Sequence, residues 1–126
     1  MSLQVELVSP ERILYSGEAD MVIARTAGGD IAFLTGHAPF VGALGIGKVV
    51  IRETAGTSVT AAVHGGFVEI KDTRVSILSD VAELATQIDV ARARESLARA
   101  GEDEAARRRA EVRLDAAGET APTGTH

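Results

Sequence analysis

At 126 residues, the chain has room for one ordinary domain or for a small domain with an appendage, and its lack of cysteine excludes disulfides, thiol catalysis and thiolate metal ligands. Its formal net charge of −5 argues against nucleic acid as the main ligand, because phosphate binding requires a concentrated basic face. No apolar run approaches the roughly 20 residues of a membrane span and the N-terminal residues do not resemble a secretion signal, so we expect a soluble intracellular protein or one peripheral to a membrane, without direct membrane insertion.

The first two-thirds of the chain has the composition of short β-strands. Residues 3–8 begin in strict alternation of apolar and polar side chains, which is typical of a half-buried strand. Further short segments are bounded by turn-forming residues, and they are residues 13–15, 19–25, 31–34, 48–52, 58–63, 67–70 and 74–78. No helical pattern separates them, which excludes βαβ units and favours an antiparallel sandwich or flattened barrel.

The pattern changes to a helical one near Thr86. Residues 88–100 contain no Gly or Pro and repeat apolar side chains at spacings of three and four; Asp89 or Thr86 can cap this helix and Gly101 ends it. A second helix follows with a thin, alanine-rich apolar stripe. We expect a weakly packed hairpin, which suits an arm that moves and equally a frayed terminus. The predicted divisions are a β-sandwich at 1–86, a helical hairpin at 87–117 and a flexible tail at 118–126.

Three sequence features suggest enzyme chemistry and are better explained otherwise. Residues 42–48 have the glycine and lysine spacing of a phosphate-binding loop, but Val49 stands where that loop needs Ser or Thr and a strand follows, so we interpret the glycines as shaping a β-turn and a close strand crossing. His37, His64 and His126 are too scattered for a metal site. No nucleophile elbow accompanies the serines and histidines. We therefore expect neither a catalytic nor a metal site.

Two glycine-containing segments are unusual. A Gly-His-Ala-Pro-Phe corner at 36–40 joins two apolar runs, and Pro39 fixes its backbone. Gly65 and Gly66 place two unrestricted backbone positions directly before a strand, which suits a bulge or close approach by another chain.

Taken together, four segments resemble the epsilon subunit of F-type ATP synthase, in the order and spacing of that family. They are GDIAFLTGHAPF (29–40), GGFVE (65–69), VSILSD (75–80) and IDVARA (88–93). The resemblance covers about residues 3–115 and implies a flattened sandwich of about ten strands followed by an antiparallel helix pair. It also implies a non-catalytic central-stalk subunit of a bacterial enzyme, bound to the gamma subunit and resting on the membrane rotor ring of c subunits. Such a subunit couples rotation to ATP synthesis and modulates ATP hydrolysis through its helices.

The resemblance also implies roles for individual residues. Asp30 matches an acidic position that faces the polar loop of the rotor ring, and His37, Ala38 and Pro39 match the corner beside it. The family's motif of ATP binding, which in some members holds the hairpin folded down, corresponds to Ile88, Asp89, Arg92 and Ala93. An arginine there supplies charge for phosphate and an aspartate can orient it or bind the sugar. Alternatively, Asp89 is only a helix cap and Arg92 lies on the solvated face.

Departures from the family pattern limit what is expected of the hairpin. Ala32 and Thr35 replace the usual Gly and Pro around the corner. The second helix, of about 13–16 residues, reaches only about 20–24 Å, which argues against deep insertion among the catalytic beta subunits. Four arginines either meet an acidic surface of the catalytic head or, as we favour, form a solvated face: Arg107, Arg108, Arg109 and Arg113. A free-standing ATP sensor and a generic interaction module remain as alternative functions, and the only cofactor considered is regulatory ATP.

Overall fold

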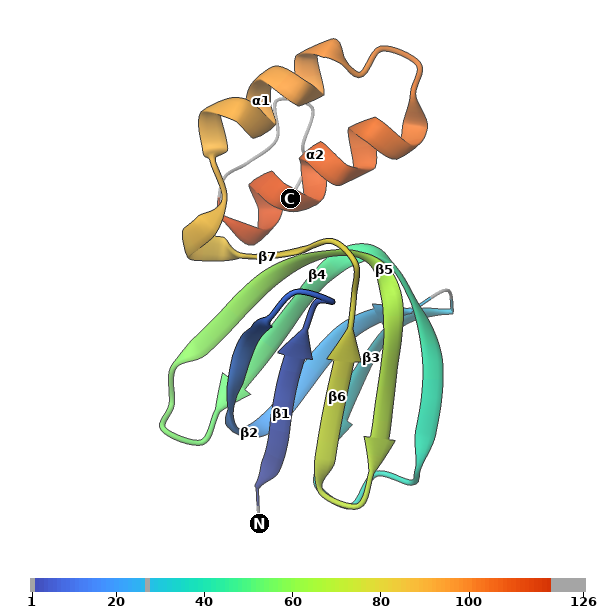
Figure 1. Ribbon diagram of the computed structural model, residues 1–126, viewed down its shortest axis with the longest axis vertical. Coiled ribbons are helices and arrows are strands. Elements are labelled where there is room, and N and C mark those ends of the chain that lie inside the picture. Colours follow the sequence, from blue (N-terminus) through green and yellow to red (C-terminus); the bar gives the residue numbers. More distant parts are fainter. Residues whose placement is uncertain (1, 27, 119–126) are drawn as a thin grey trace.

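The computed structural model describes residues 2–26 and 28–118, which form a largely antiparallel β-sandwich with a two-helix hairpin at one end (Figure 1). The strands are β1 (Leu3–Val8), β2 (Ile13–Thr26), β3 (Gly29–Leu34), β4 (Phe40–Glu53), β5 (Ser58–Lys71), β6 (Arg74–Leu78) and β7 (Ala82–Leu84). A short 3₁₀ helix, η1 (Ala85–Gln87), leads into α1 (Val90–Arg99) and α2 (Glu104–Ala116). The predicted fold class is therefore confirmed. Apart from Gly118, the predicted tail lies outside the described residues.

Pairing between β1 and β6 closes the sandwich. The strand order is β1-β6-β5-β4-β2-β3, and β1 pairs with β2 as well, so that five strands form a continuous ring. β3 extends the edge of β2, and β7 pairs with β5. All pairings are antiparallel except that of β1 with β6. No helix among the described residues has the length and apolar character needed to cross a membrane.

The core follows from the apolar alternation of the strands. In β1, Leu3, Val5 and Leu7 are buried and the residues between them are partly exposed, as the periodicity predicts. The largest fully buried side chains in the sandwich come from six of the strands, and they are Phe33, Leu3, Leu7, Ile51, Ile70, Ile77, Val5, Val22, Val49, Val63 and Val68. With one Phe and otherwise aliphatic side chains, this core is filled by close packing of small branched groups.

The expected number of about ten short strands is wrong, because several predicted breaks do not exist. β2, β4 and β5 are each 14 residues long and continue through the segments that we interpreted as turns. β2 pairs with β1 in its first half and with β3 and β4 in its second, and β5 pairs with β7 before it pairs with β6. β4 pairs with β5 along nearly its whole length. Long strands shared between the two layers therefore replace pairs of short ones.

Three of the glycines at the supposed breaks make room for a neighbouring side chain instead. A Cβ at Gly17 would meet the ring of Tyr15, and one at Gly47 would meet the side chain of Arg25. Gly42 is covered in the same way by the ring of Phe40. The Tyr15 hydroxyl donates a hydrogen bond to Glu53 (2.6 Å), and burial together with this bond raises the pKa of Tyr15 to about 12. The predicted β-turn at residues 42–48 is accordingly absent, since these residues belong to β4.

β5 bends at Gly65 and Gly66, whose φ angles are +89° and +124°. Before the bend β5 pairs with β7, and after it with β6. A Cβ on Gly66 would collide with the backbone of Leu78, so the close approach predicted for this glycine pair is made by the protein's own chain. The buried Ser79 hydroxyl lies 2.6 Å from the carbonyl oxygen of Gly65 and fastens the crossing.

The helical hairpin rests on the sandwich mainly through α2. α2 lies on β4 and β5, and α1 packs on α2 (Figure 1). The buried side chains of α2 are Ala110, Leu114 and Ala116, close to the predicted alanine-rich stripe. Ala116 joins Ala62 and Ile88 in a small apolar cluster that is separate from the main core. Because these groups are small, the apolar contribution to hairpin docking is modest.

The Gly66 crossing can be tested by substitution. We expect Gly66→Ala to lower the free energy of unfolding by at least 2 kcal/mol more than Gly56→Ala, as measured by urea denaturation. Both positions have positive φ, which costs a non-glycine residue about 1–3 kcal/mol, but only Gly66 also meets backbone atoms, whereas Gly56 faces open space. Equal losses at the two sites would show that the crossing tolerates a side chain.

Candidate functional site

A polar cleft lies where the start of α1 meets α2 and the β7 region. It has a volume of about 460 Å³ and is lined by Glu83, Gln87, Asp89, Arg92, Ala93, Ser96 and Arg113. Three of the four residues of the predicted ATP motif therefore line one cavity. The fourth, Ile88, is buried in the small apolar cluster with Ala62 and anchors the segment instead.

The local geometry of the motif is that of a helix start. The Asp89 carboxylate accepts a hydrogen bond from the backbone N–H of Arg92 (3.0 Å) and so caps α1, as expected. Arg92 is exposed, and among residues 2–26 and 28–118 its guanidinium has no recorded hydrogen bond or ion pair. The cap therefore leaves the Arg92 side chain available for an anion at the mouth of the cleft.

The chemistry of the cleft suits a phosphate better than an aromatic base. Two guanidinium groups, from Arg92 and Arg113, border it, together with the hydroxyl of Ser96. Arginine forks match phosphate oxygens. Among the described residues that line the cleft, Ala93 is the only apolar one, and none carries an aromatic ring on which a base could stack. The volume lies within the range of small-molecule sites.

The residues predicted to meet the rotor ring lie at the two ends of β3. Asp30, near its start, receives two hydrogen bonds from the Arg25 guanidinium (3.1 and 3.4 Å). The corner at residues 36–39 follows the other end, so the structure separates Asp30 from it by the length of the strand. The His37 ring packs edge-on against Phe33, with 5.2 Å between ring centroids, and its Nδ1 lies 2.7 Å from the carbonyl oxygen of Ala38. These contacts make the corner a rigid surface feature.

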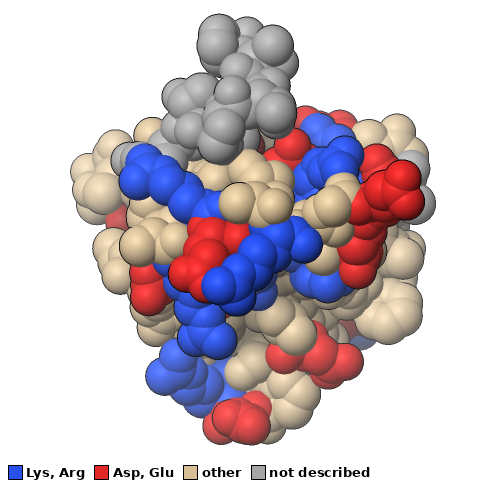
Figure 2. Space-filling model, turned by 90° about the horizontal axis from the view of Figure 1, so that it is seen from above, with Lys and Arg blue, Asp and Glu red and all other residues tan. Residues whose placement is uncertain are grey.

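The four arginines of α2 are not gathered on one solvated face. Arg107 donates to the carbonyl oxygen of Gly101, and Arg108 is exposed. Arg109 and Arg113 are half-buried and directed at the sandwich. Seen from above, the hairpin end of the molecule carries acidic and basic groups side by side and no large field of one sign (Figure 2).

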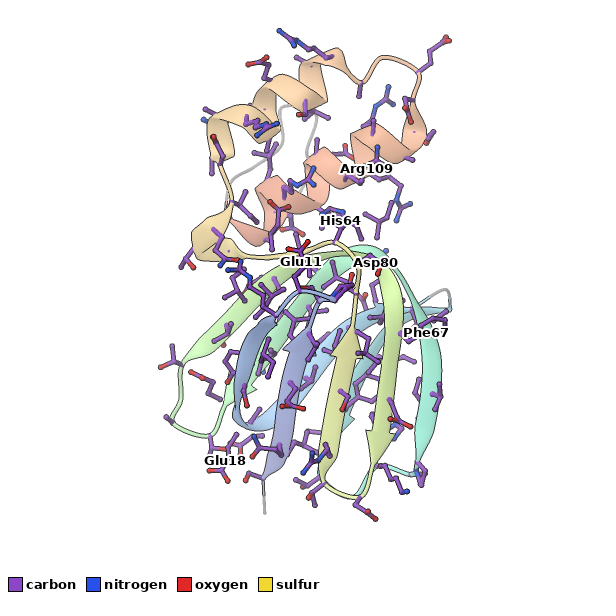
Figure 3. All side chains as sticks on the ribbon, viewed as in Figure 1. Glu11, Glu18, His64, Phe67, Asp80 and Arg109 are labelled. Carbon is purple, nitrogen blue, oxygen red and sulfur yellow. The ribbon has the colours of Figure 1, made fainter. Side chains whose placement is uncertain are left out.

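Charged contacts between α2 and the sheet were missed by the sequence reasoning. The Arg113 Nε donates to Glu83 of β7 (2.5 Å), and Lys48 of β4 pairs with Asp115 (3.1 Å). His64 of β5 lies beneath them with its side chain 3% exposed (Figure 3). We call these five residues the latch. The only signal in the sequence is a histidine that interrupts an apolar strand segment, and its partners come from three other elements.

His64 is held in an environment that disfavours its charged form. Burial lowers its pKa most, and the nearby Arg113 lowers it further. Glu83 acts in the opposite direction, but its oxygen is 3.7 Å from Nε2, which is too long for a hydrogen bond. Both ring nitrogens are buried without a hydrogen-bond partner among the described residues.

The outer face of the sandwich carries an apolar row that runs across five strands. Successive cross-strand pairs join its members, which are Ile13 of β2, Val8 of β1, Leu78 of β6, Phe67 of β5 and Ala43 of β4. Ile13, Leu78 and Phe67 are 58%, 50% and 57% exposed. A groove of about 400 Å³, lined in part by Phe67, Leu78 and Pro10, adjoins the row. Contiguous exposed apolar surface of this kind marks interaction sites.

Within residues 2–26 and 28–118, no group of three or more His, Asp or Glu side chains is arranged to hold a metal ion. The scattered histidines thus remain apart in the fold: His37 is at the corner after β3, and His64 is under α2. His126 lies outside the described residues.

Known proteins resemble the chain in sequence and in structure. The family model for the beta-sandwich domain of the ATP synthase delta/epsilon chain matches residues 2–85. An ATP synthase epsilon chain of Streptomyces griseus is 51% identical over 116 residues, which cover 90% of this chain and 94% of that protein. One from Thermobifida fusca is 52% identical over 100 residues, which cover 75% and 72%.

A solved structure agrees with this. A chain in the Euglena gracilis mitochondrial ATP synthase structure of OSCP, F1 and c-ring has a TM-score of 0.68 and 25% identity, over 90% of this chain and 76% of that one. The family model alone matches well over half of the sequence, and the relatives extend the match into the helices. The chain belongs to the family of ATP synthase epsilon chains.

Proposed function

We propose that the sandwich docks on the gamma subunit in the central stalk, through its apolar row, and couples rotation of the membrane rotor ring to ATP synthesis in the catalytic head. As an ATP synthase epsilon chain, the protein is a non-catalytic subunit of the enzyme. In this proposal residues 1–86 dock, and the hairpin at 87–117 is a regulatory arm. The assembly would hold the chain at the cytoplasmic face of the bacterial cell membrane.

The observation that carries this proposal is the exposed apolar row on a chain that belongs to the family of ATP synthase epsilon chains. Phe67, Leu78 and Ile13 expose large side chains on strands that are each hydrogen-bonded to a neighbouring strand. A surface of this kind loses little conformational freedom on binding, so that burying it contributes directly to affinity. The row lies on the sandwich and not on the hairpin, so docking through it leaves the hairpin unconstrained.

For the rotor ring, we propose that Asp30 and the corner at 37–39 contact the polar loops of the c subunits or the stalk beside them. The Asp30 side chain is more than half exposed although it pairs with Arg25, so part of its carboxylate remains accessible to a partner. His37, Ala38 and Pro39 are fixed by the packing of His37 on Phe33 and Phe40. Each end of β3 thus presents a rigid polar contact.

We expect Phe67→Asp to weaken binding to a catalytic head that contains gamma and lacks this subunit by at least about tenfold, because a carboxylate must then be desolvated in an apolar contact. Binding would be measured by surface plasmon resonance, with ATP hydrolysis by the same head recorded alongside. Leu34→Asp is the matched control, since Leu34 is 48% exposed on β3, outside the row.

The outcomes separate two levels of the proposal. No binding of the folded, unmodified chain at micromolar concentration would contradict the stalk assignment as a whole. Normal binding of both Asp variants would leave the stalk assignment standing and remove only the row from the interface.

A second function is favoured by the cleft. We propose that the cleft binds the phosphates of ATP through Arg92, and that the bound nucleotide keeps the hairpin folded on the sandwich. Arg113 and Glu83 belong both to the cleft and to the contact between α2 and β7, so a ligand there touches both helices and the sheet. This supports a regulatory role for ATP in place of a catalytic one.

For this second function, we expect Arg92→Ala to reduce ATP affinity at least about tenfold in isothermal titration calorimetry, since a charge-assisted phosphate contact is lost. Arg99→Ala is the control, because Arg99 lies on α1 and pairs with Glu95 away from the cleft. Asp89→Asn keeps an acceptor for the helix cap while removing the charge. If Arg92→Ala and Asp89→Asn both bound ATP as tightly as the Arg99→Ala control, the nucleotide proposal would be abandoned.

The short hairpin limits the way in which the arm can act on the head. α2 has 13 residues and therefore spans about 20 Å. Arg109 and Arg113 face the sandwich in this arrangement, so a contact between them and the catalytic beta subunits requires the hairpin to leave the sheet first. We propose that Arg107 and Arg108 belong to the same head-facing set after release.

A further inference from the structure

His64 occupies the centre of the contact between the hairpin and the sandwich. It is the last residue of β5 before the Gly65 bend, and its backbone N–H donates to the carbonyl oxygen of Val81 (3.0 Å), which fixes its position. Its ring is 3% exposed, although it reaches no hydrogen-bond partner among the described residues. A buried imidazole is destabilising when neither of its nitrogens has a hydrogen-bond partner. His64 is therefore a candidate for a role in the contact between the hairpin and the sandwich.

The charged groups around His64 come from every element that packs on it. α2 contributes Arg113 and Arg109, and β7 contributes Glu83. Figure 3 labels His64 and, on the helix above it, Arg109. On the β4 side, Lys48 is occupied by Asp115 of α2. The single carboxylate facing the ring is already bonded to Arg113 through the same oxygen that lies nearest His64. A proton on His64 would thus place a third cation beside the guanidinium groups of Arg113 and Arg109, while the carboxylate of Glu83 is already bonded to Arg113.

We propose that protonation of His64 releases the helical hairpin from the sandwich, so that the docked arrangement is specific to the neutral imidazole. In the docked form a charged ring would be desolvated and would face Arg113 and Arg109, which belong to the element that leaves. Once α2 has moved away, the ring is hydrated and both arginines are gone. Release is therefore the way in which the protein accommodates the proton.

The sign of the pH effect follows from linkage. The pKa of His64 is lowered when the hairpin is docked and returns toward its ordinary value of about 6.5 when it is released. The released form then binds more protons at mildly acidic pH. Docking is fully favoured above about pH 7 and weakens as the pH falls through 6.5 toward the docked pKa. For one proton, the ratio of docked to released chain falls by up to about fourfold between pH 7.5 and pH 6.0.

This inference concerns the isolated chain and does not depend on the gamma, rotor-ring or nucleotide assignments. It adds to those assignments the condition under which the hairpin leaves the sandwich, namely protonation of His64. A mildly acidic environment would free Arg109 and Arg113 for other contacts. The apolar contribution that opposes release is modest, because several of the buried residues at the interface are alanines.

Hydrogen exchange of the α2 backbone amides tests the proposal, because it detects rare openings. For the full chain, protection factors corrected for intrinsic exchange should fall by up to about fourfold between pH 7.5 and pH 6.0. His64→Gln, which cannot be protonated, should abolish the fall, and His37→Gln should retain it. Equal protection at both pH values in the unmodified chain, or the same fall in His64→Gln, would overturn the proposal.

An NMR titration of the histidine rings gives a second readout that needs no folded variant. With the hairpin docked, the His64 ring should titrate below the ordinary value of about 6.5. A midpoint at or above that value would overturn the proposal even if His64→Gln failed to fold.

Discussion

The bend of β5 at Gly65 and Gly66 is the constraint on which the rest of the structure depends. Two consecutive residues with positive φ turn one strand from β7 to β6, and the absence of a side chain at Gly66 admits the backbone of Leu78. His64 directly precedes the bend and points toward the hairpin, and Phe67 directly follows it and faces outward (Figure 3). Three peptide units, from His64 to Phe67, thus fix the contact with the hairpin relative to the apolar row.

The contact between hairpin and sandwich combines little apolar area with several charges. Leu114 is the only large side chain that α2 buries, and the remaining specificity comes from the pairs of Arg113 with Glu83 and of Lys48 with Asp115. Ion pairs that are partly exposed contribute modestly and depend on salt and pH. An interface of this composition gives only a small free-energy difference between the docked and the released hairpin. The proposed regulatory arm requires such a small difference. The main sandwich, with its continuous aliphatic core, does not share this sensitivity.

Local features of the fold could be predicted from the sequence, whereas its long-range features could not. The alternation in β1 and the Asp89 cap of α1 depend on residues within one turn or strand, and both appear as expected. Asp89, Arg92 and Ala93 share a cleft because they lie within one turn of helix. By contrast, the sequence predicts a break between the segments 13–15 and 19–25 and a β-turn at 42–48, where the structure has continuous strands. A glycine that admits a neighbour's side chain, as Gly17 and Gly47 do, has the same sequence signal as a turn. The latch joins residues from β4, β5, β7 and α2, so no local pattern could reveal it.

The parallel pairing of β1 with β6 has a consequence for how the molecule assembles. Gln4 lies opposite Arg74, 70 positions later in the chain, and this pairing completes the ring that begins with β1 and β2. Contacts between residues so far apart are entropically expensive to form, and proteins dominated by them fold slowly. During synthesis, β1 can complete its pairing only after the chain as far as β6 has been made. Until then one edge of β1 has no partner and is open to pairing with other chains.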